Sequence, residues 1–86
     1  MKRSEALVEV DRILHGPRSK DYGPIEDNFG RIATGWAVIF GHEVTPRQVA
    51  LAMDWVKTAR LINNPDHEDG WLDKIGYSAI GSELKR

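Results

Sequence analysis

Two groups of residues in this chain have types and spacings that suit the binding of phosphates. The first is the stretch "RSKDYGP" (residues 18–24), which combines two cations, a tyrosine and a Gly-Pro turn. Arg18 and Lys20 could neutralise phosphate oxygens, and Tyr22 could stack on a base or sugar. The helix expected to begin near Pro24 would add unpaired N–H groups that attract an anion. The alternative is a purely local role, with the two cations serving only solubility.

The second group begins on a helix expected over residues 46–62. Asp54, Lys57 and Arg60 follow one another at three-residue spacing and therefore share one side of that helix. Lys57 and Arg60 suit phosphate, whereas Asp54 could hold Mg²⁺, which needs only one or two carboxylates beside substrate phosphates. The alternative is an ordinary ion pair between Asp54 and Lys57 on a solvated face.

The next expected helix, residues 67–84, carries acids on one face. Its short connection to the preceding helix predicts an antiparallel hairpin. In that hairpin the end of one helix lies beside the start of the other, so the cations and acids of the two helices would meet. The side chains expected near one another are Arg60, His67 and Asp69, with Lys57 and Asp73 about one turn further along.

The predicted site has two parts. No catalytic residue is assigned, and Mg²⁺ is the one cofactor that the acids suggest. The predicted ligand-binding residues are Arg18, Lys20, Tyr22, Lys57, Arg60, His67 and Trp71, and the predicted metal ligands are Asp54, Asp69 and Asp73.

Four helices and no strands are expected to position these residues. Apolar residues recur at helical spacing, and no alternating strand pattern of useful length is present. Gly16-Pro17 predicts a stop, and Thr45 followed by Pro46 is a strong start signal. The residues 46–62 carry apolar stripes on two sides, so this helix is expected to be central or shared with a second copy. The prediction is a single all-α domain over residues 1–86, with helices at about 4–15, 24–40, 46–62 and 67–84.

The composition limits the partners and the compartment. The net charge is −1, with 12 basic and 13 acidic residues, so nothing global attracts DNA or RNA. There is no cysteine, and no apolar run approaches the roughly 20 residues that cross a bilayer. We therefore expect a cytoplasmic protein without nucleic-acid or membrane partners. An 86-residue chain with three tryptophans is also expected to form a homodimer or a higher homo-oligomer.

Three segments carry a resemblance to a known family: "KDYGPIEDNFGRIATGW" (residues 20–36), "VALAMDWVKTARL" (49–61) and "NPDHEDGWLDKIGYSAI" (64–80). They resemble small phage-type proteins related to the MazG-like all-α NTP pyrophosphatases. The resemblance implies an all-helical oligomer that recognises nucleotides. Members of that group cleave nucleoside triphosphates with Mg²⁺ held by an EExxE motif and a later ExxD motif.

This sequence departs from both metal motifs. The later motif would fall on residues 70–73, where Asp73 is kept and Gly70 replaces the glutamate. The earlier motif would fall on residues 50–54, where only Asp54 is acidic. Fewer carboxylates and the added cations Lys57 and Arg60 favour holding phosphates over cleaving them.

Three functions follow from these observations. The first is a nucleotide-binding protein that captures a phosphorylated nucleotide, with sequestration of a cyclic or other signalling nucleotide in a phage–host immune context as its use. The first alternative is a Mg²⁺-dependent nucleoside triphosphate pyrophosphohydrolase. The second alternative is a protein-interaction module anchored by Trp36, Trp55 and Trp71. If the chain is phage-encoded, its expected location is the host cytoplasm.

Overall fold

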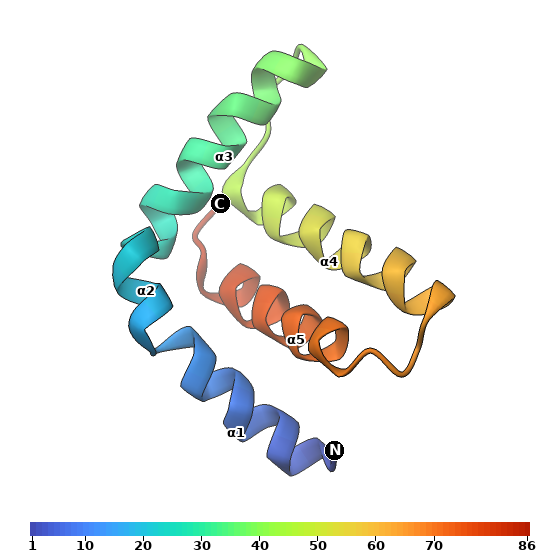
Figure 1. Cartoon of the computed structure of the whole chain (residues 1–86). Coiled ribbons are helices and arrows are strands. Elements are labelled where there is room, and N and C mark those ends of the chain that lie inside the picture. Colours follow the sequence, from blue (N-terminus) through green and yellow to red (C-terminus); the bar gives the residue numbers. More distant parts are fainter.

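Every regular element of the chain is a helix. The computed structural model describes residues 1–86, apart from the side chain of Arg18. No strand occurs in residues 1–86, so the prediction of an all-helical chain is confirmed. In Figure 1, α1, α2 and α3 follow one another along one side, and α4 and α5 form a hairpin on the other. The helices are α1 (Arg3–Leu14), α2 (Pro17–Tyr22), α3 (Ile25–Phe40), α4 (Pro46–Asn63) and α5 (Glu68–Glu83).

The connector after α1 differs from the prediction of four helices, because it contains a fifth helix, α2, of six residues. Gly16 and Pro17 do end α1, but Pro17 also occupies the first position of α2, where its fixed φ favours a helix. Gly23 ends α2 with a φ of 75°, a conformation that favours glycine. Arg31 of α3 donates a hydrogen bond to the Tyr22 carbonyl at 3.2 Å, which fastens α2 to α3.

The other four helices lie close to their predicted ranges. Each differs from its predicted start and end by no more than one residue. His67 and Leu84 were expected inside the last helix and are instead the N-cap and C-cap residues of α5. At the start of α4, Thr45 and Gln48 form a reciprocal capping box, in which each side chain accepts from the other residue's backbone N–H.

Helices α4 and α5 lie antiparallel, as the short connection predicts. The C-terminal part of α4 contacts the N-terminal part of α5, and the N-terminal part of α4 contacts the C-terminal part of α5. Small residues allow close approach at both ends of the hairpin, and ion pairs join its middle. The matched pairs are Ala50 with Gly81, Asp54 with Lys74, Lys57 with Asp73, and Leu61 with Gly70.

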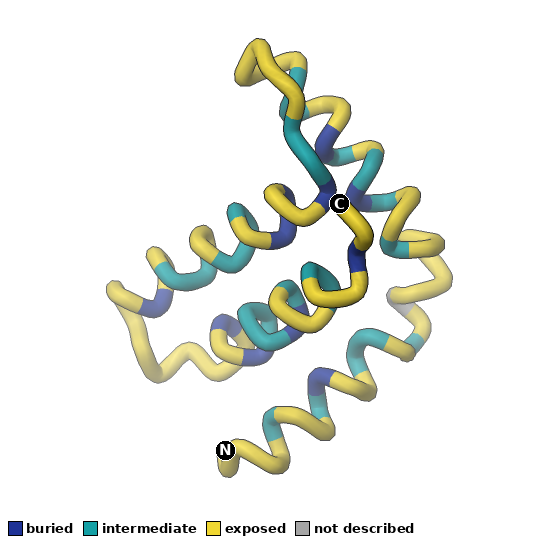
Figure 2. Tube along the Cα trace, turned by 180° about the vertical axis from the view of Figure 1, so that it is seen from behind, coloured by how far each residue is buried: buried dark blue, intermediate teal, exposed yellow. Residues whose placement is uncertain are grey.

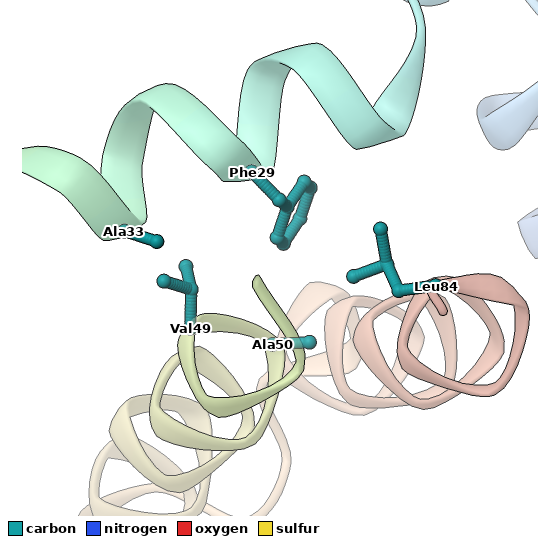
Figure 3. Packing of buried hydrophobic residues seen from close by; sticks show 5 residues of the cluster. All are labelled: Phe29, Ala33, Val49, Ala50 and Leu84. Atoms are coloured by element: carbon teal, nitrogen blue, oxygen red, sulfur yellow. The ribbon is translucent and has the colours of Figure 1, made fainter. Parts of the chain in front are cut away.

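The most compact part of the core lies where α3 crosses the start of the hairpin. Phe29 and Ala33 of α3 face Val49 and Ala50 of α4, and Leu84 inserts from the end of α5 (Figure 3). All five side chains are at most 5% exposed. Because this cluster joins three segments that are distant in sequence, it fixes α3 across the α4–α5 hairpin.

The last residues of the chain extend this packing beyond α5. The C-terminus lies between α3 and the start of α4 (Figure 1). The Arg47 backbone N–H donates to the Arg86 carbonyl at 2.9 Å, and the Lys85 N–H donates to the Glu26 carboxylate at 3.3 Å. In contrast, the C-terminal end of α3 and the α4–α5 connection are exposed (Figure 2).

Candidate functional site

A cavity of about 290 Å³ lies between α1, α2, α3 and α5, with Met53 contributed by α4. Its walls are mostly apolar and include Phe29 and Tyr77, whose rings meet edge to face with centroids 6.4 Å apart. A mainly apolar cavity with a few polar groups is typical of small-molecule sites, which usually enclose roughly 300–1,000 Å³. The described side chains that bring polar atoms to its lining are Ser19, Tyr22, Asn28, Asp73 and Tyr77.

One charged side chain, Asp73, lines the cavity among the described residues, and it is ion-paired. Lys57 Nζ lies 3.1 Å from Asp73 Oδ2. The Lys57 side chain is 15% exposed and that of Asp73 is 43% exposed, so the lysine is the more deeply enclosed partner. The pair therefore leaves this part of the cavity wall close to neutral. Asp73 nevertheless remains one of the residues that line the cavity.

The predicted metal ligands do not meet at one point. Asp54 is paired with Lys74 at 3.0 Å and lines a separate hollow between α4 and α5, whereas Asp73 lines the cavity. Asp69 is exposed in the first turn of α5. Among the described residues, no three or more His, Asp or Glu side chains are grouped so that they could hold a metal ion. The three predicted ligands therefore do not form one cluster within the chain, and Mg²⁺ binding through one or two of these carboxylates stays a prediction.

The structure does not contain the ion pair between Asp54 and Lys57 that was the alternative interpretation of these residues. The expected i,i+3 partner, Lys57, instead crosses to Asp73 on α5, and Asp54 crosses to Lys74. Lys74 additionally donates to the Thr58 hydroxyl. Asp54 and Asp73 thus each pair with a lysine of the neighbouring helix rather than of their own.

The predicted loop residues lie on α2. Tyr22 lines the cavity and is half exposed, so the structure brings it together with Asp73 as part of one site. Lys20 is exposed on α2 and is absent from the lining. The prediction for the Arg18 side chain lies outside the described residues.

Four other predicted ligand-binding residues are absent from the cavity lining: Lys57, which pairs with Asp73, and the three residues that follow. His67 caps α5, because its Nδ1 accepts from the Gly70 N–H at 3.2 Å. Trp71 donates its indole N–H to the Pro65 carbonyl at 2.8 Å and so holds the α4–α5 connection. Arg60 is exposed near the end of α4, one turn beyond Lys57.

Sequence reasoning missed part of the cavity wall. Tyr77 follows Asp73 by four residues, so helical spacing already placed the two on one face. Asn28 and Ser19 gave no such signal, because their place in the lining depends on how α2 and α3 are positioned relative to α5. One pKa shift lies outside the cavity, on α1, where a hydrogen bond from Arg12 lowers the pKa of the partly exposed Glu9 carboxylate.

The outer side of α4 forms a second feature, here called the α4 stripe and defined as Leu51, Trp55 and Ile62. These side chains are 70%, 69% and 77% exposed, respectively. They belong to one of the two apolar sides predicted for this helix. On the other side Val49 and Met53 pack inward, whereas Val56 is 38% exposed. The described residues of this chain therefore leave these three side chains of the α4 stripe largely uncovered.

The structure shows an all-helical chain with a small, mainly apolar cavity. The chain belongs to the family described as "Domain of unknown function (DUF6378)", whose model matches residues 5–85. No solved structure matches the chain. No helix in the described part of the chain is both long and apolar enough to span a bilayer.

Two curated relatives are phage proteins, which supports the prediction of a phage protein. The chain is 40% identical over 80 residues to the Gene 55 protein of Mycobacterium phage L5, covering 92% of this chain and 51% of that protein. It is 35% identical over 72 residues to the Gene 55 protein of Mycobacterium phage D29, covering 84% and 48%, respectively. The chain thus spans about half the length of both relatives.

Proposed function

We propose that this chain binds a nucleotide and places the base, rather than the phosphates, in the cavity. The lining of the cavity carries this proposal: aromatic and apolar walls, a few polar groups, and a carboxylate whose charge a lysine balances. Such a surface suits a planar heterocycle, whose faces bury apolar area against rings and whose edge forms hydrogen bonds. The resemblance to MazG-like pyrophosphatases supports a nucleotide as the ligand.

The phosphates lie outside the cavity in this proposal, near exposed cations on two elements. Lys20 is exposed on α2, between the lining residues Ser19 and Tyr22. Arg60 is exposed on α4, one turn beyond Lys57. The sequence hypothesis has Lys57 binding phosphate directly. Because Lys57 is already ion-paired with Asp73, the proposal assigns the phosphates to Lys20 and Arg60 instead.

The proposed activity is capture without cleavage. Asp54 and Asp73 are each ion-paired with a lysine, an arrangement that opposes their shared use by metal ions. For a phage protein, capture of a signalling nucleotide, linear or cyclic, would remove it from the host cytoplasm. The pyrophosphohydrolase alternative predicts instead that nucleoside triphosphates release pyrophosphate in the presence of Mg²⁺.

The first experiment is mass spectrometry of small molecules released from the purified protein, combined with calorimetric titration of nucleoside monophosphates and triphosphates with and without Mg²⁺. We expect binding and recovery of the nucleotide unchanged after long incubation. Pyrophosphate release that Asp73→Asn abolishes would replace capture by hydrolysis. Absence of binding to every nucleotide tested would overturn the proposal.

A variant of the cavity links any binding to this site. A methyl group added at Gly76, which lines the cavity, would meet Leu14 and Val10 at 3.9 and 4.0 Å, an ordinary contact distance. Gly76→Ala should therefore fold normally and reduce the space for a base. The matched control is Gly35→Ala on α3, where nothing lies within 4 Å of the added methyl. Equal affinity in both variants would exclude the cavity as the site.

Self-association is the proposed reason for the exposed α4 stripe. Antiparallel contact of α4 with α4 of a second copy, about an axis between Val56 and Lys57, places Leu51 opposite Ile62 and Trp55 opposite the small Thr58. A large residue opposite a small one is the arrangement that packed helices need. An 86-residue chain also gains from such burial, because its own core is small.

Sedimentation analysis of the wild type and of Trp55→Glu tests this proposal. The wild type should sediment as a dimer or larger species, and Trp55→Glu should sediment as a monomer with its helical circular dichroism intact. The matched control is Trp71→Glu, because Trp71 lies outside the stripe at the α4–α5 connection. A monomeric wild type would exclude a partner copy on this face.

A further inference from the structure

The polar edge of the cavity restricts which base it can take. Asp73 has two carboxylate oxygens, and Lys57 pairs with Oδ2. No described residue donates a hydrogen bond to Oδ1. Each oxygen of a carboxylate can accept more than one hydrogen bond, so the pair with Lys57 leaves room for a ligand. Asp73 lines the cavity, and its carboxylate carries two adjacent acceptors, one of them paired with Lys57.

We infer that the cavity selects guanine among the nucleobases, through two hydrogen bonds from the base to Asp73. This inference rests on the proposed nucleotide function and names its ligand class. Guanine carries two neighbouring donors, the ring N1–H and the exocyclic N2 amine. Adenine has one exocyclic amine beside a ring acceptor, and uracil has a single ring N–H between two carbonyls, so neither matches two acceptors side by side.

The charge of the site favours a neutral base over a cation or a phosphate. An unpaired carboxylate in an apolar cavity would attract an amine or metal ion strongly. Lys57 removes most of that attraction, because its ammonium lies 3.1 Å from Oδ2. A phosphate in the same place would meet the Asp73 carboxylate and apolar walls. The neutral edge of a base needs no net negative charge in the site, and its N–H donors are not repelled by the carboxylate.

Besides Asp73, the polar residues of the lining are Ser19, Tyr22, Asn28 and Tyr77, and the amide of Asn28 complements the same edge of the base. Asn28 lines the cavity from α3 and carries amide N–H donors. The guanine carbonyl O6 is an acceptor adjacent to N1–H, so a donor beside the carboxylate completes the pattern. The rings of Phe29 and Tyr77 supply apolar area for the faces of the base.

The wild-type protein gives the first test, with four ligands that share the same ribose phosphate: GMP, IMP, AMP and UMP. Because a bidentate contact is worth about 1–3 kcal/mol of discrimination, GMP should bind roughly 5- to 150-fold more tightly than AMP or UMP. IMP lacks the N2 amine and should bind more weakly than GMP. Titration calorimetry measures all four dissociation constants under one buffer condition.

A change of preference gives the second test. In Asp73→Asn one acceptor becomes an amide donor, which suits the N1–H and C2 carbonyl of xanthine. This variant should lose its preference for GMP and prefer XMP. The control is Asp66→Asn, the same change on the exposed α4–α5 connection, which should keep the wild-type order of affinities.

The possible results separate this inference from the proposed function. Failure of all four monophosphates and of the triphosphates to bind would overturn both. Binding to the wild type without preference for GMP, or with equal affinity for GMP and IMP, would overturn only the guanine assignment. If Asp73→Asn does not fold, the wild-type comparison of GMP with IMP still decides the matter, because it needs no variant.

Discussion

Two helical glycines should respond to alanine in opposite directions, which tests the packing of the chain directly. Gly35 lies on the exposed side of α3, and a Cβ added there would have no atom within 4 Å. Alanine is favoured over glycine in a helix interior by about 1 kcal/mol. Gly35→Ala should therefore raise the free energy of unfolding by about that amount. For a domain of this size the melting temperature should rise by about 4–8 °C.

Gly70 is the opposite case, because it packs against the neighbouring helix of the hairpin. A Cβ added there would lie 2.9 Å from Leu61 Cδ2 and 3.1 Å from Leu61 Cγ. Leu61 is 5% exposed, so its side chain has little space into which it can move. Overpacking of this kind costs about 1–3 kcal/mol, which exceeds the gain of about 1 kcal/mol from helix propensity. Gly70→Ala should therefore lower stability by roughly 1 kcal/mol.

Urea denaturation followed by circular dichroism, at equal protein concentrations, measures both changes. A third variant identifies the cause: in a Leu61→Ala background the obstructing atoms are absent, so Gly70→Ala should become neutral or stabilising. Gly35→Ala and Gly70→Ala shifting stability in the same direction would refute the reasoning. A loss of stability in Gly35→Ala would show that another chain covers this side of α3.

Three further predictions concern single contacts. Thr45→Ala removes a side-chain cap of α4 and should cost about 1 kcal/mol in urea denaturation, and Thr45→Ser should restore most of it. Asp73→Asn should lower the free energy of unfolding by about 1 kcal/mol more than Lys57→Gln does, because it leaves the more enclosed ammonium without a partner. Equal losses in the two variants would contradict the burial of Lys57. Trp71→Phe loses the hydrogen bond to the Pro65 carbonyl and should cost about 0.5–1.5 kcal/mol, measured by thermal melting.

Capping residues, glycines and prolines at the helix ends predicted most of the secondary structure. Thr45 and Pro46 mark the start of α4 through local rules that hold in any fold, and the structure has the complete capping box there. The same rules were incomplete for Pro17, because a proline that ends one helix can also begin the next. Its second role produced α2, and the sequence pattern alone did not distinguish a loop from a six-residue helix.

The candidate site was predictable only in part. Helical spacing placed Asp73 and Tyr77 on one face, and the short connection paired α4 with α5. The sequence did not decide whether Lys57 would pair with Asp73 or with its i,i+3 neighbour Asp54. That choice depends on the register between α4 and α5. Tyr22 was predicted to bind a ligand, and it does line the cavity, next to walls that no local pattern indicated.

The sequence by itself determined that the chain is helical, where α4 starts, and that α4 has two apolar sides. These properties depend on backbone preferences and on spacing along one element. Only the tertiary structure decided which apolar side is buried, which lysine neutralises which carboxylate, and that a cavity is enclosed between α1, α2, α3 and α5. The physical reason is that each of these outcomes is a contact between residues distant in the sequence, and its energy depends on how whole helices pack.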